Sequence, residues 1–192
     1  MNDVSPDERR WRRRSLWLLP PLLLLTLFWN GRENAARWLE ERELRPRDVA
    51  AGAQAPLGGA QWRLHEFNTL EPPAKRGWLP GSRAALAVFK VHAESPDLPT
   101  RWRGCRIALH DARGRTWLPA VDPVLRIPPT AARGCVAAAH RGLAPGSSID
   151  VIEVFMVPRD AVPPWSLSVS MESDRPDYLR FTPQAAGGPE PR

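Results

Sequence analysis

The sequence predicts an all-β fold: an antiparallel sandwich of about seven or eight short strands at residues 61–183, preceded by one N-terminal transmembrane helix and a short helical stalk. Within residues 165–171, three serines alternate with apolar residues, which is the period of a half-buried strand. Residues that favour turns separate such segments at short intervals, and no segment of helical period lies between them. This order disfavours a parallel α/β sheet.

The chain begins with a basic arm, residues 1–14, followed by a charge-free segment. The arginines of the arm are Arg9, Arg10, Arg12, Arg13 and Arg14. Arginines beside an apolar helix stay on the cytoplasmic side, so they predict a cytoplasmic N-terminus and an extracytoplasmic C-terminal domain at the plasma (inner) membrane. The predicted transmembrane helix, residues 15–31, is short, because a bilayer core of about 30 Å needs about 20 helical residues. A cleaved signal peptide is the alternative, although no small-residue cleavage site follows Trp29.

Residues 32–45 are predicted to form the helical stalk, and residues 46–60 a linker. Glu33 and Arg37 lie four residues apart, as do Glu41 and Arg45, a spacing that stabilises helices. Pro46 is expected to end this helix. The following residues are rich in proline, alanine and glycine, which indicates an extended connection.

Between residues 61 and 183 the alternation of apolar and polar residues predicts the strands of the sandwich. They are expected at residues 62–67, 84–93, 105–110, 116–117, 135–140, 149–157, 165–171 and 178–182. The segment Ile149–Val157 is apolar on both faces, which predicts an interior strand. Residues 118–133 contain four prolines and predict an exposed crossover loop, where a binding function would reside. The tail, residues 184–192, is expected to be disordered.

Three segments carry a resemblance to a known family: Leu109–Trp117, Ala144–Gly146 and Phe155–Ala161. They are similar to the "D-x-x-G-R-x-aromatic" hairpin, the "P-G" turn and the "F-x-V-P" strand end of a bacterial immunoglobulin-like domain family of unknown function. Members of that family occur in lipoproteins, membrane-anchored proteins and secreted antigens. The resemblance covers residues 82 to 181. It implies an extracytoplasmic immunoglobulin-like sandwich and brings no catalytic residues.

The two cysteines, Cys105 and Cys135, each open a predicted strand. In an oxidising compartment such a pair predicts one disulfide, whereas a cytosolic domain would hold two free thiols. Cys105 with His110 and Cys135 with His140 also repeat a C-x4-H spacing that would suit a Cys2His2 metal site. An odd offset places cysteine and histidine on opposite faces of a strand, so we expect no metal and no other cofactor.

The residues that could support hydrolysis are His110, Asp111, Ser147 and Ser148. No G-x-S-x-G motif is present, and adjacent residues on a strand diverge, so His110 and Asp111 do not form an oriented pair. Asp111 is interpreted as the first residue of a hairpin turn. Four glutamates, Glu66, Glu94, Glu153 and Glu172, are interpreted as solvated strand positions. The sequence therefore predicts no enzyme.

The formal charge of +6 gives little support for a nucleic-acid partner. The basic arm accounts for +2 of it, and the remaining +4 is spread along the chain without a basic cluster.

The sequence thus predicts a single-pass membrane-anchored, extracytoplasmic binding or assembly module of the bacterial cell envelope, whose partners are the lipid bilayer and another envelope protein. The alternatives are a small-ligand or metal-binding carrier domain and, less favoured, a hydrolase.

Overall fold

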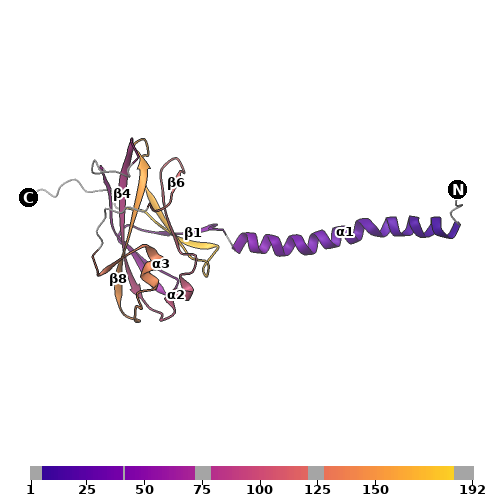
Figure 1. Cartoon of the computed structure of the whole chain (residues 1–192), viewed down its shortest axis with the longest axis horizontal. Coiled ribbons are helices and arrows are strands. Elements are labelled where there is room, and N and C mark those ends of the chain that lie inside the picture. The colour runs from indigo at the N-terminus through magenta and orange to yellow at the C-terminus, as the bar shows by residue number, and fades with distance from the viewer. Residues whose placement is uncertain (1–5, 41, 72–78, 121–127, 184–192) are drawn as a thin grey trace, which may run out of the picture. The chain divides into compact units, whose positions relative to one another are not determined.

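The computed structural model describes residues 6–40, 42–71, 79–120 and 128–183 (Figure 1). The chain divides into two compact units, residues 1–41 and residues 42–192. In the described residues, the first unit is a single helix and the second is built mainly of strands. The two are described separately.

The helix α1 runs without interruption from Pro6 to Glu40. It therefore includes most of the predicted basic arm, the predicted transmembrane segment and most of the predicted stalk, so these segments form one continuous helix. Pro20 and Pro21 lie inside the helix rather than breaking it. By length and mean hydropathy together, no helix within the described part of the chain is long and apolar enough to cross a bilayer.

In its described residues the second unit is a sandwich of two five-stranded sheets, which confirms the predicted all-β fold (Figure 1). The first sheet has the order β1 (Arg45–Val49), β10 (Asp177–Phe181), β9 (Ser166–Ser170), β5 (Arg106–His110) and β6 (Thr116–Trp117). The second has the order β2 (Gln54–Leu57), β3 (Ala60–Leu70), β4 (Ser82–Ala93), β8 (Ser148–Pro158) and β7 (Ala131–Arg133).

The sheets are mixed rather than purely antiparallel, which corrects the prediction. Strand β1 pairs with β10 in parallel, and β7 pairs with β8 in parallel. In both cases the paired strands are joined by a long stretch of chain, as a parallel pair requires. Strand β8 lies between β4 and β7, so the interior position predicted for residues 149–157 is confirmed.

The predicted linker at residues 46–60 is wrong, because these residues form β1, β2 and the start of β3. Prolines suggested a connection, but β1 and β2 are the outer strands of their sheets, where a missing N–H donor is tolerated. Gly58 and Gly59 join β2 to β3 with φ angles of 59° and 74°. Both central residues of a type I′ hairpin need positive φ, so this glycine pair is a turn signal.

The strand predicted at residues 135–140 is also wrong, because Gly134–Ala139 form the helix α3. Gly134 has a φ of 77° and ends β7, after which the alanine-rich sequence favours a helix. Cys135, Ala138 and Ala139 are buried on one face of α3. The predicted crossover loop at residues 118–133 contains β7, and its residues 121–127 lie outside the described part of the chain, as does the tail at 184–192.

Aromatic side chains fill the space between the two sheets. Trp62 of β3 lies with its ring centroid 4.9 Å from that of Trp102, which follows the short helix α2 (Leu98–Arg101). Phe89 contacts both Trp62 and Phe181 of the opposite sheet. The buried indole of Trp102 donates a hydrogen bond to the Gly58 carbonyl, so its one polar group is satisfied.

Candidate functional site

A disulfide joins Cys105 to Cys135, as the sequence predicted. Cys105 immediately precedes β5 of the first sheet, and Cys135 belongs to α3, beside the edge of the second. The two Cα atoms are 6.2 Å apart, and the residues are separated by 30 positions in the sequence. The disulfide therefore ties the short helix α3 to the opposite sheet.

A pocket lies beside this disulfide, at the point along β8 where the neighbouring segment changes from β7 to Pro119. Strand β7 pairs with β8 as far as Arg133 opposite Ile152, and Pro119 forms an isolated bridge with Phe155. Glu153 lies in the gap between them. The pocket has a volume of about 360 Å³. It is lined by Cys105, Arg106, Ile107, Leu118, Pro119, Arg133, Gly134, Cys135, Val136 and Glu153, and we call it the disulfide pocket.

Glu153 points toward the interior of the sandwich. Its neighbours on the same face of β8, Val151 and Phe155, are both 0 % exposed, and Glu153 itself is 6 % exposed. Its carboxyl lies against Gly134, where an added Cβ would come within 3.2 Å of Oε1. No described residue donates a hydrogen bond to this carboxyl. A buried carboxylate without a donor is costly, so its protonated form is favoured.

Burial raises the pKa of Glu153 to about 7, against a partial opposing effect of the positive charge of Arg133. The carboxyl therefore exchanges its proton near neutral pH. A group of this kind in a pocket marks a candidate functional site.

The interpretation of Glu153 as a solvated residue is wrong. The signal that identifies it was present in the sequence, because Glu153 lies two positions from both Val151 and Phe155 and thus shares their inward face. A carboxylate within an inward-facing apolar series is rare without a partner.

His110 lies on the outward face of β5, away from the disulfide pocket. Its Nδ1 is 3.0 Å from Thr116 Oγ1, and its Nε2 is 2.9 Å from Ser168 Oγ. Ser168 is 1 % exposed, so this serine is inaccessible to a substrate. Burial lowers the pKa of His110, Glu43 opposes this shift, and the charges of Arg106 and Arg180 add to it. These contacts give the His110 ring and the buried Ser168 hydroxyl hydrogen-bonding partners on neighbouring strands.

The fold does not bring together the residues that could support hydrolysis. Ser147 Oγ donates to the Ala144 carbonyl within a turn. Ser148 Oγ lies 3.1 Å from Nδ1 of His92, its cross-strand neighbour on β4, rather than near His110. Such a pair is ordinary contact between adjacent strands.

The Cys2His2 arrangement does not form, because both cysteines are bonded to each other. His140 lies exposed at the C-terminal end of α3. Across the described ranges, no group of three or more His, Cys, Asp or Glu side chains is placed to hold a metal ion.

Asp111 begins the hairpin turn between β5 and β6, the role predicted for it. Its Oδ1 accepts hydrogen bonds from the backbone N–H groups of Arg113 and Arg115, at 2.9 and 3.0 Å. Its Oδ2 accepts from Nε of Arg115, whose guanidinium also reaches Asp160. Burial acts to raise the pKa of Asp111, but the hydrogen bonds from Arg115 and from the backbone outweigh it, so the pKa is lowered.

Replacing Asp111 by alanine is expected to lower the melting temperature by several degrees, because two backbone donors lose their acceptor. Asp111→Asn retains an oxygen acceptor, so its melting temperature is expected to fall less. Calorimetry of both variants at pH 7 and pH 3 checks this. The difference between wild type and Asp111→Ala should shrink at pH 3, because a lowered carboxyl pKa stabilises the fold above the unfolded value and loses that effect as the pH falls. An Asp111→Asn variant as unstable as Asp111→Ala would contradict the role of the backbone hydrogen bonds.

Comparisons with known proteins show no match to a family model or to a curated protein. The chain is similar to an uncharacterised β-sandwich protein from Clostridium difficile 630, with 10% identity, a TM-score of 0.42, and coverage of 73% of this chain and 96% of that one. It is also similar to the secreted protein MPT63 of Mycobacterium tuberculosis, with 11% identity, a TM-score of 0.47, and coverage of 72% and 98%. The yjhA protein of Bacillus subtilis matches with 8% identity, a TM-score of 0.36, and coverage of 70% and 98%. These similarities concern the fold.

Proposed function

We propose that the protein is a membrane-tethered, non-catalytic binding module of the bacterial cell envelope. In this proposal α1 holds the chain in the plasma (inner) membrane with its N-terminus in the cytoplasm. The sandwich faces the extracytoplasmic side and binds its partner, another envelope protein, at the disulfide pocket. The immunoglobulin-like family that the sequence resembles would suit such a role.

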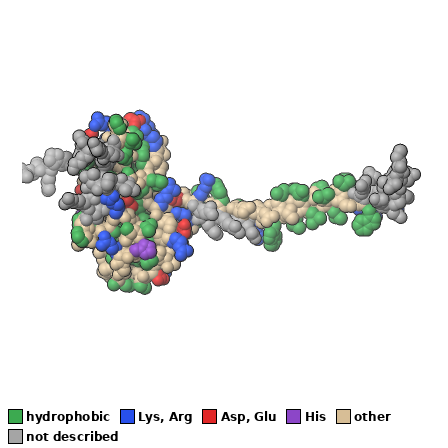
Figure 2. Space-filling model, in the orientation of Figure 1, with side chains coloured by type: hydrophobic (Ala, Val, Ile, Leu, Met, Phe, Trp, Pro, Cys, Tyr) green, Lys and Arg blue, Asp and Glu red, His purple; other side chains and the backbone are tan. Residues whose placement is uncertain are grey.

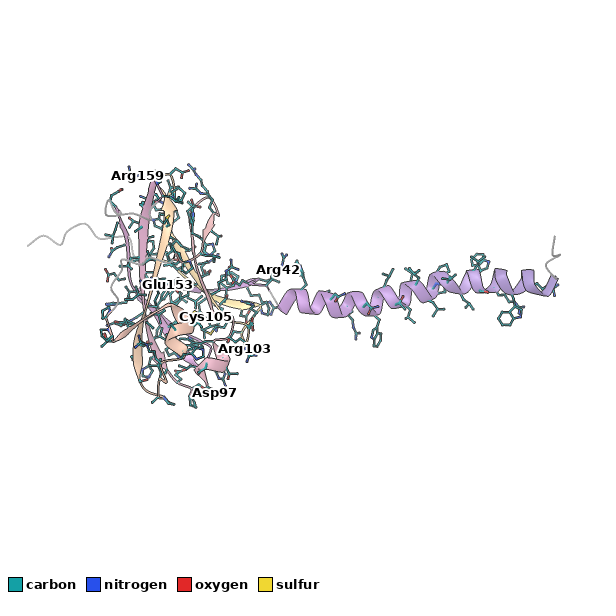
Figure 3. All side chains as sticks on the ribbon, viewed as in Figure 1. Arg42, Asp97, Arg103, Cys105, Glu153 and Arg159 are labelled. Atoms are coloured by element: carbon teal, nitrogen blue, oxygen red, sulfur yellow. A yellow bond between two sulfur atoms is a disulfide. The ribbon has the colours of Figure 1, made fainter. Side chains whose placement is uncertain are left out.

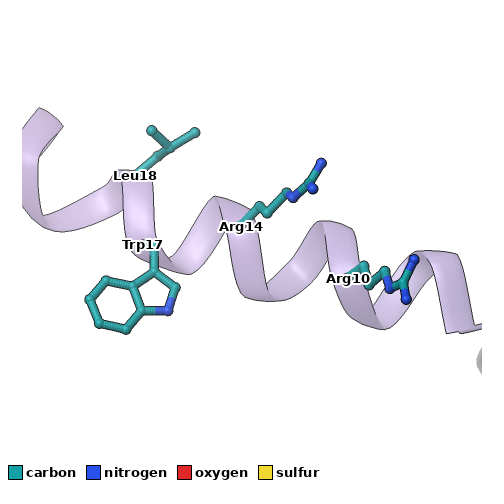
Figure 4. A pocket seen from close by; sticks show the side chains of 4 residues that line it. All are labelled: Arg10, Arg14, Trp17 and Leu18. Carbon is teal, nitrogen blue, oxygen red and sulfur yellow. The ribbon is translucent and has the colours of Figure 1, made fainter.

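The observation that carries the proposal is the exposed apolar surface of α1. Its large apolar side chains between Leu16 and Trp29 are 53 to 77% exposed, and they are visible along the helix in Figure 2. Continuous apolar surface of this kind marks a membrane or protein contact. Figure 4 shows Arg10, Arg14 and Leu18 following one another along one side of the helix, with the indole of Trp17 extending from the other. Guanidinium and indole groups are the side chains that favour the headgroup region.

The apolar stretch is shorter than a bilayer core, and this constrains how α1 would insert. The charge-free residues 15–29 span roughly 22 Å at the rise of an α-helix, against a core of about 30 Å. Arg14 and Arg32 would extend their side chains toward the two interfaces, and the bilayer would thin locally. Arg32 already lies over the ring of Trp29, 5.3 Å from its centroid.

The disulfide supports the extracytoplasmic side, because disulfides persist in oxidising compartments and are rare in the cytosol. At the rim of the disulfide pocket, Leu118 and Val136 are 54% and 52% exposed. An apolar rim around buried polar groups is a common composition for a binding site.

The proposal is tested by topology and by cross-linking in cells. Membranes are washed with alkaline carbonate, and cysteines of intact cells are alkylated before and after reduction. We expect the chain to stay in the pellet and both cysteines to resist alkylation until they are reduced. A photo-reactive residue at Val136 is expected to cross-link to an envelope protein, whereas one at the exposed Leu79, as matched control, is not.

Release by carbonate together with freely alkylated thiols would overturn the membrane and envelope assignment. Equal cross-linking from positions 136 and 79 would overturn the assignment of the binding surface to the disulfide pocket. The two outcomes are independent of each other.

A further inference from the structure

We infer that the disulfide pocket accepts an extended segment of the envelope partner, which pairs antiparallel with β5 at Ile107 and places one apolar side chain in the pocket. This inference rests on the proposed function, which assigns the binding of an envelope protein to the same pocket. In Figure 3, Cys105 and Glu153 mark the region.

The edge of β5 beside the pocket is paired along part of its length. On one side β5 pairs with β9 from Arg106 to His110. On the other side its register with β6 includes Leu109 and His110, and no other described strand pairs with β5 there. Cys105, Arg106 and Ile107 line the pocket, so the pocket follows the stretch of β5 that β6 does not reach.

The register shows which backbone groups this edge leaves open. In an antiparallel pair, the N–H and C=O groups of alternate residues point to the same neighbouring strand. The N–H of Asp111 donates to the Arg115 carbonyl, which lies toward β6. Leu109 and Ile107, two and four positions earlier, therefore present their backbone groups on that side. Among the described residues, none forms a backbone hydrogen bond with Ile107 there.

Pro119 accounts for the end of β6 before Ile107. The register that pairs Leu109 with Trp117 would bring Pro119 opposite Ile107 if β6 continued. Proline has no N–H to donate to the Ile107 carbonyl, and Pro119 forms its bridge with Phe155 of the opposite sheet. An edge with an open donor and acceptor is a template for another strand, whose main-chain hydrogen bonds supply affinity.

A strand added at this edge would direct one side chain into the pocket. Ile107 is 2% exposed and faces the interior, and residues directly opposite each other in an antiparallel pair share a face. The residue that pairs with Ile107 therefore points inward, where Leu118, Val136 and the disulfide form an apolar wall. A volume of about 360 Å³ lies at the small end of ligand pockets, so it suits one aliphatic side chain such as valine.

The probe is the peptide acetyl-Lys-Thr-Val-Thr-Lys-amide, titrated calorimetrically into the full-length protein in detergent micelles, with empty micelles as the blank. Two matched peptides carry one N-methyl group, either on the valine or on the second threonine. When the valine pairs with Ile107, its N–H points to β5 and the threonine N–H points to solvent. We expect methylation of the valine to weaken binding by about tenfold, the effect of one lost hydrogen bond, and methylation of the threonine to leave it unchanged.

Hydrogen exchange of single amides tests the edge directly. In the free protein the Ile107 amide should exchange faster than that of Ala108, whose N–H points to β9. Saturating peptide should slow the exchange of Ile107 by about tenfold or more, because its N–H then donates to the added strand. The Leu109 amide, which β6 already covers, should be unaffected.

A pair of variants tests the same hydrogen bond from the protein side. Ile107→Pro removes the donor, and proline is tolerated on a strand where its missing N–H faces an open edge. This variant should bind the peptide about tenfold more weakly. Ile107→Val is the matched control, because it keeps the N–H and an aliphatic side chain, and it should bind as wild type. Circular dichroism and an intact disulfide confirm folding, and the methylated peptides give the same test without any variant.

Equal binding of the unmethylated and the N-methylvaline peptides would overturn the inference, and so would an Ile107 amide whose exchange saturating peptide does not change. If either occurs while the cross-link from Val136 to an envelope protein persists, the pocket binds its partner without strand addition and the proposed function stands. Loss of that cross-link together with peptide binding would remove both.

Discussion

Replacing both cysteines, with Cys105→Ala and Cys135→Ala, is expected to lower the free energy of unfolding by about 3.5 kcal/mol. The disulfide closes a loop across 30 sequence positions, and in the chain-entropy model a loop of that size restricts the unfolded chain by about this amount. Since domains of this size have unfolding free energies of about 5 to 15 kcal/mol, the loss would be a large fraction of the total.

The loss should be felt most strongly at the disulfide pocket. Helix α3 has six residues, far fewer than the roughly 12 that an isolated helix needs. It is held by its buried face and by the bond from Cys135 to Cys105. Without that bond the wall formed by Gly134, Cys135 and Val136 should open more often than the sheets do.

Urea denaturation followed by tryptophan fluorescence measures the loss, because Trp62 and Trp102 are both buried in the core. Reduced wild type is the matched control and should unfold at the same urea concentration as the double variant. Hydrogen exchange at α3 provides the local readout. A midpoint equal to that of oxidised wild type would show that the loop constraint contributes nothing to stability.

Local alternation predicted most of the strands correctly because it depends on neighbouring residues alone. Residues 116–117 and 149–157 were assigned to the right elements, and the turn at Asp111 was recognised from its residue types. The segment at residues 165–171 also forms a strand, as predicted, but two of its three serines are buried. Ser168 and Ser170 are 1 % and 0 % exposed, since neighbouring side chains cover them: Ser168 Oγ lies 2.9 Å from His110 Nε2, and Ser170 Oγ donates to Glu43.

The errors occurred where the structure depends on distant residues. Composition predicts a linker from residue 46 on, since nothing local reveals that residues 46–49 pair with β10 more than 120 positions away. The sequence pattern predicts a strand at residues 135–140, yet Gly134 has a positive φ and begins a helix that runs to Ala139. The composition of a segment does not reveal which distant strand or sheet it packs against, and that packing determines its conformation.

The candidate site was predictable only in part. The disulfide followed from the cysteine count and the expected compartment. The pocket did not, because it arises where β7 and Pro119 leave a gap along β8, and a gap has no sequence pattern. Glu153 was readable as an inward-facing carboxyl, but its significance depends on that gap.

Replacing Glu153 by glutamine is expected to stabilise the protein at pH 8 and to have little effect at pH 4. The pKa of this carboxyl is about 7 in the folded state and near its ordinary value of 4.5 in the unfolded chain. Between these values the folded state binds more protons than the unfolded state, so the stability of wild type falls as the pH rises through this window. Glutamine is uncharged throughout and removes this dependence.

The gain at pH 8 should approach about 3 kcal/mol, since each unit of pKa difference corresponds to about 1.4 kcal/mol. Urea midpoints of wild type and Glu153→Gln at pH 4, 6 and 8 measure it, and the difference between the two proteins isolates Glu153 from other titrating groups. Glu94→Gln, which makes the same substitution at an exposed position directly after β4, is the matched control.

A difference between wild type and Glu153→Gln that is the same at pH 4 and pH 8 would mean that the carboxyl titrates normally. The expected trend would instead show that the fold carries an ionised, buried carboxylate at pH 8 at the cost of its own stability. Proteins retain such groups at sites of function, because a better-packed neutral residue is readily found by mutation.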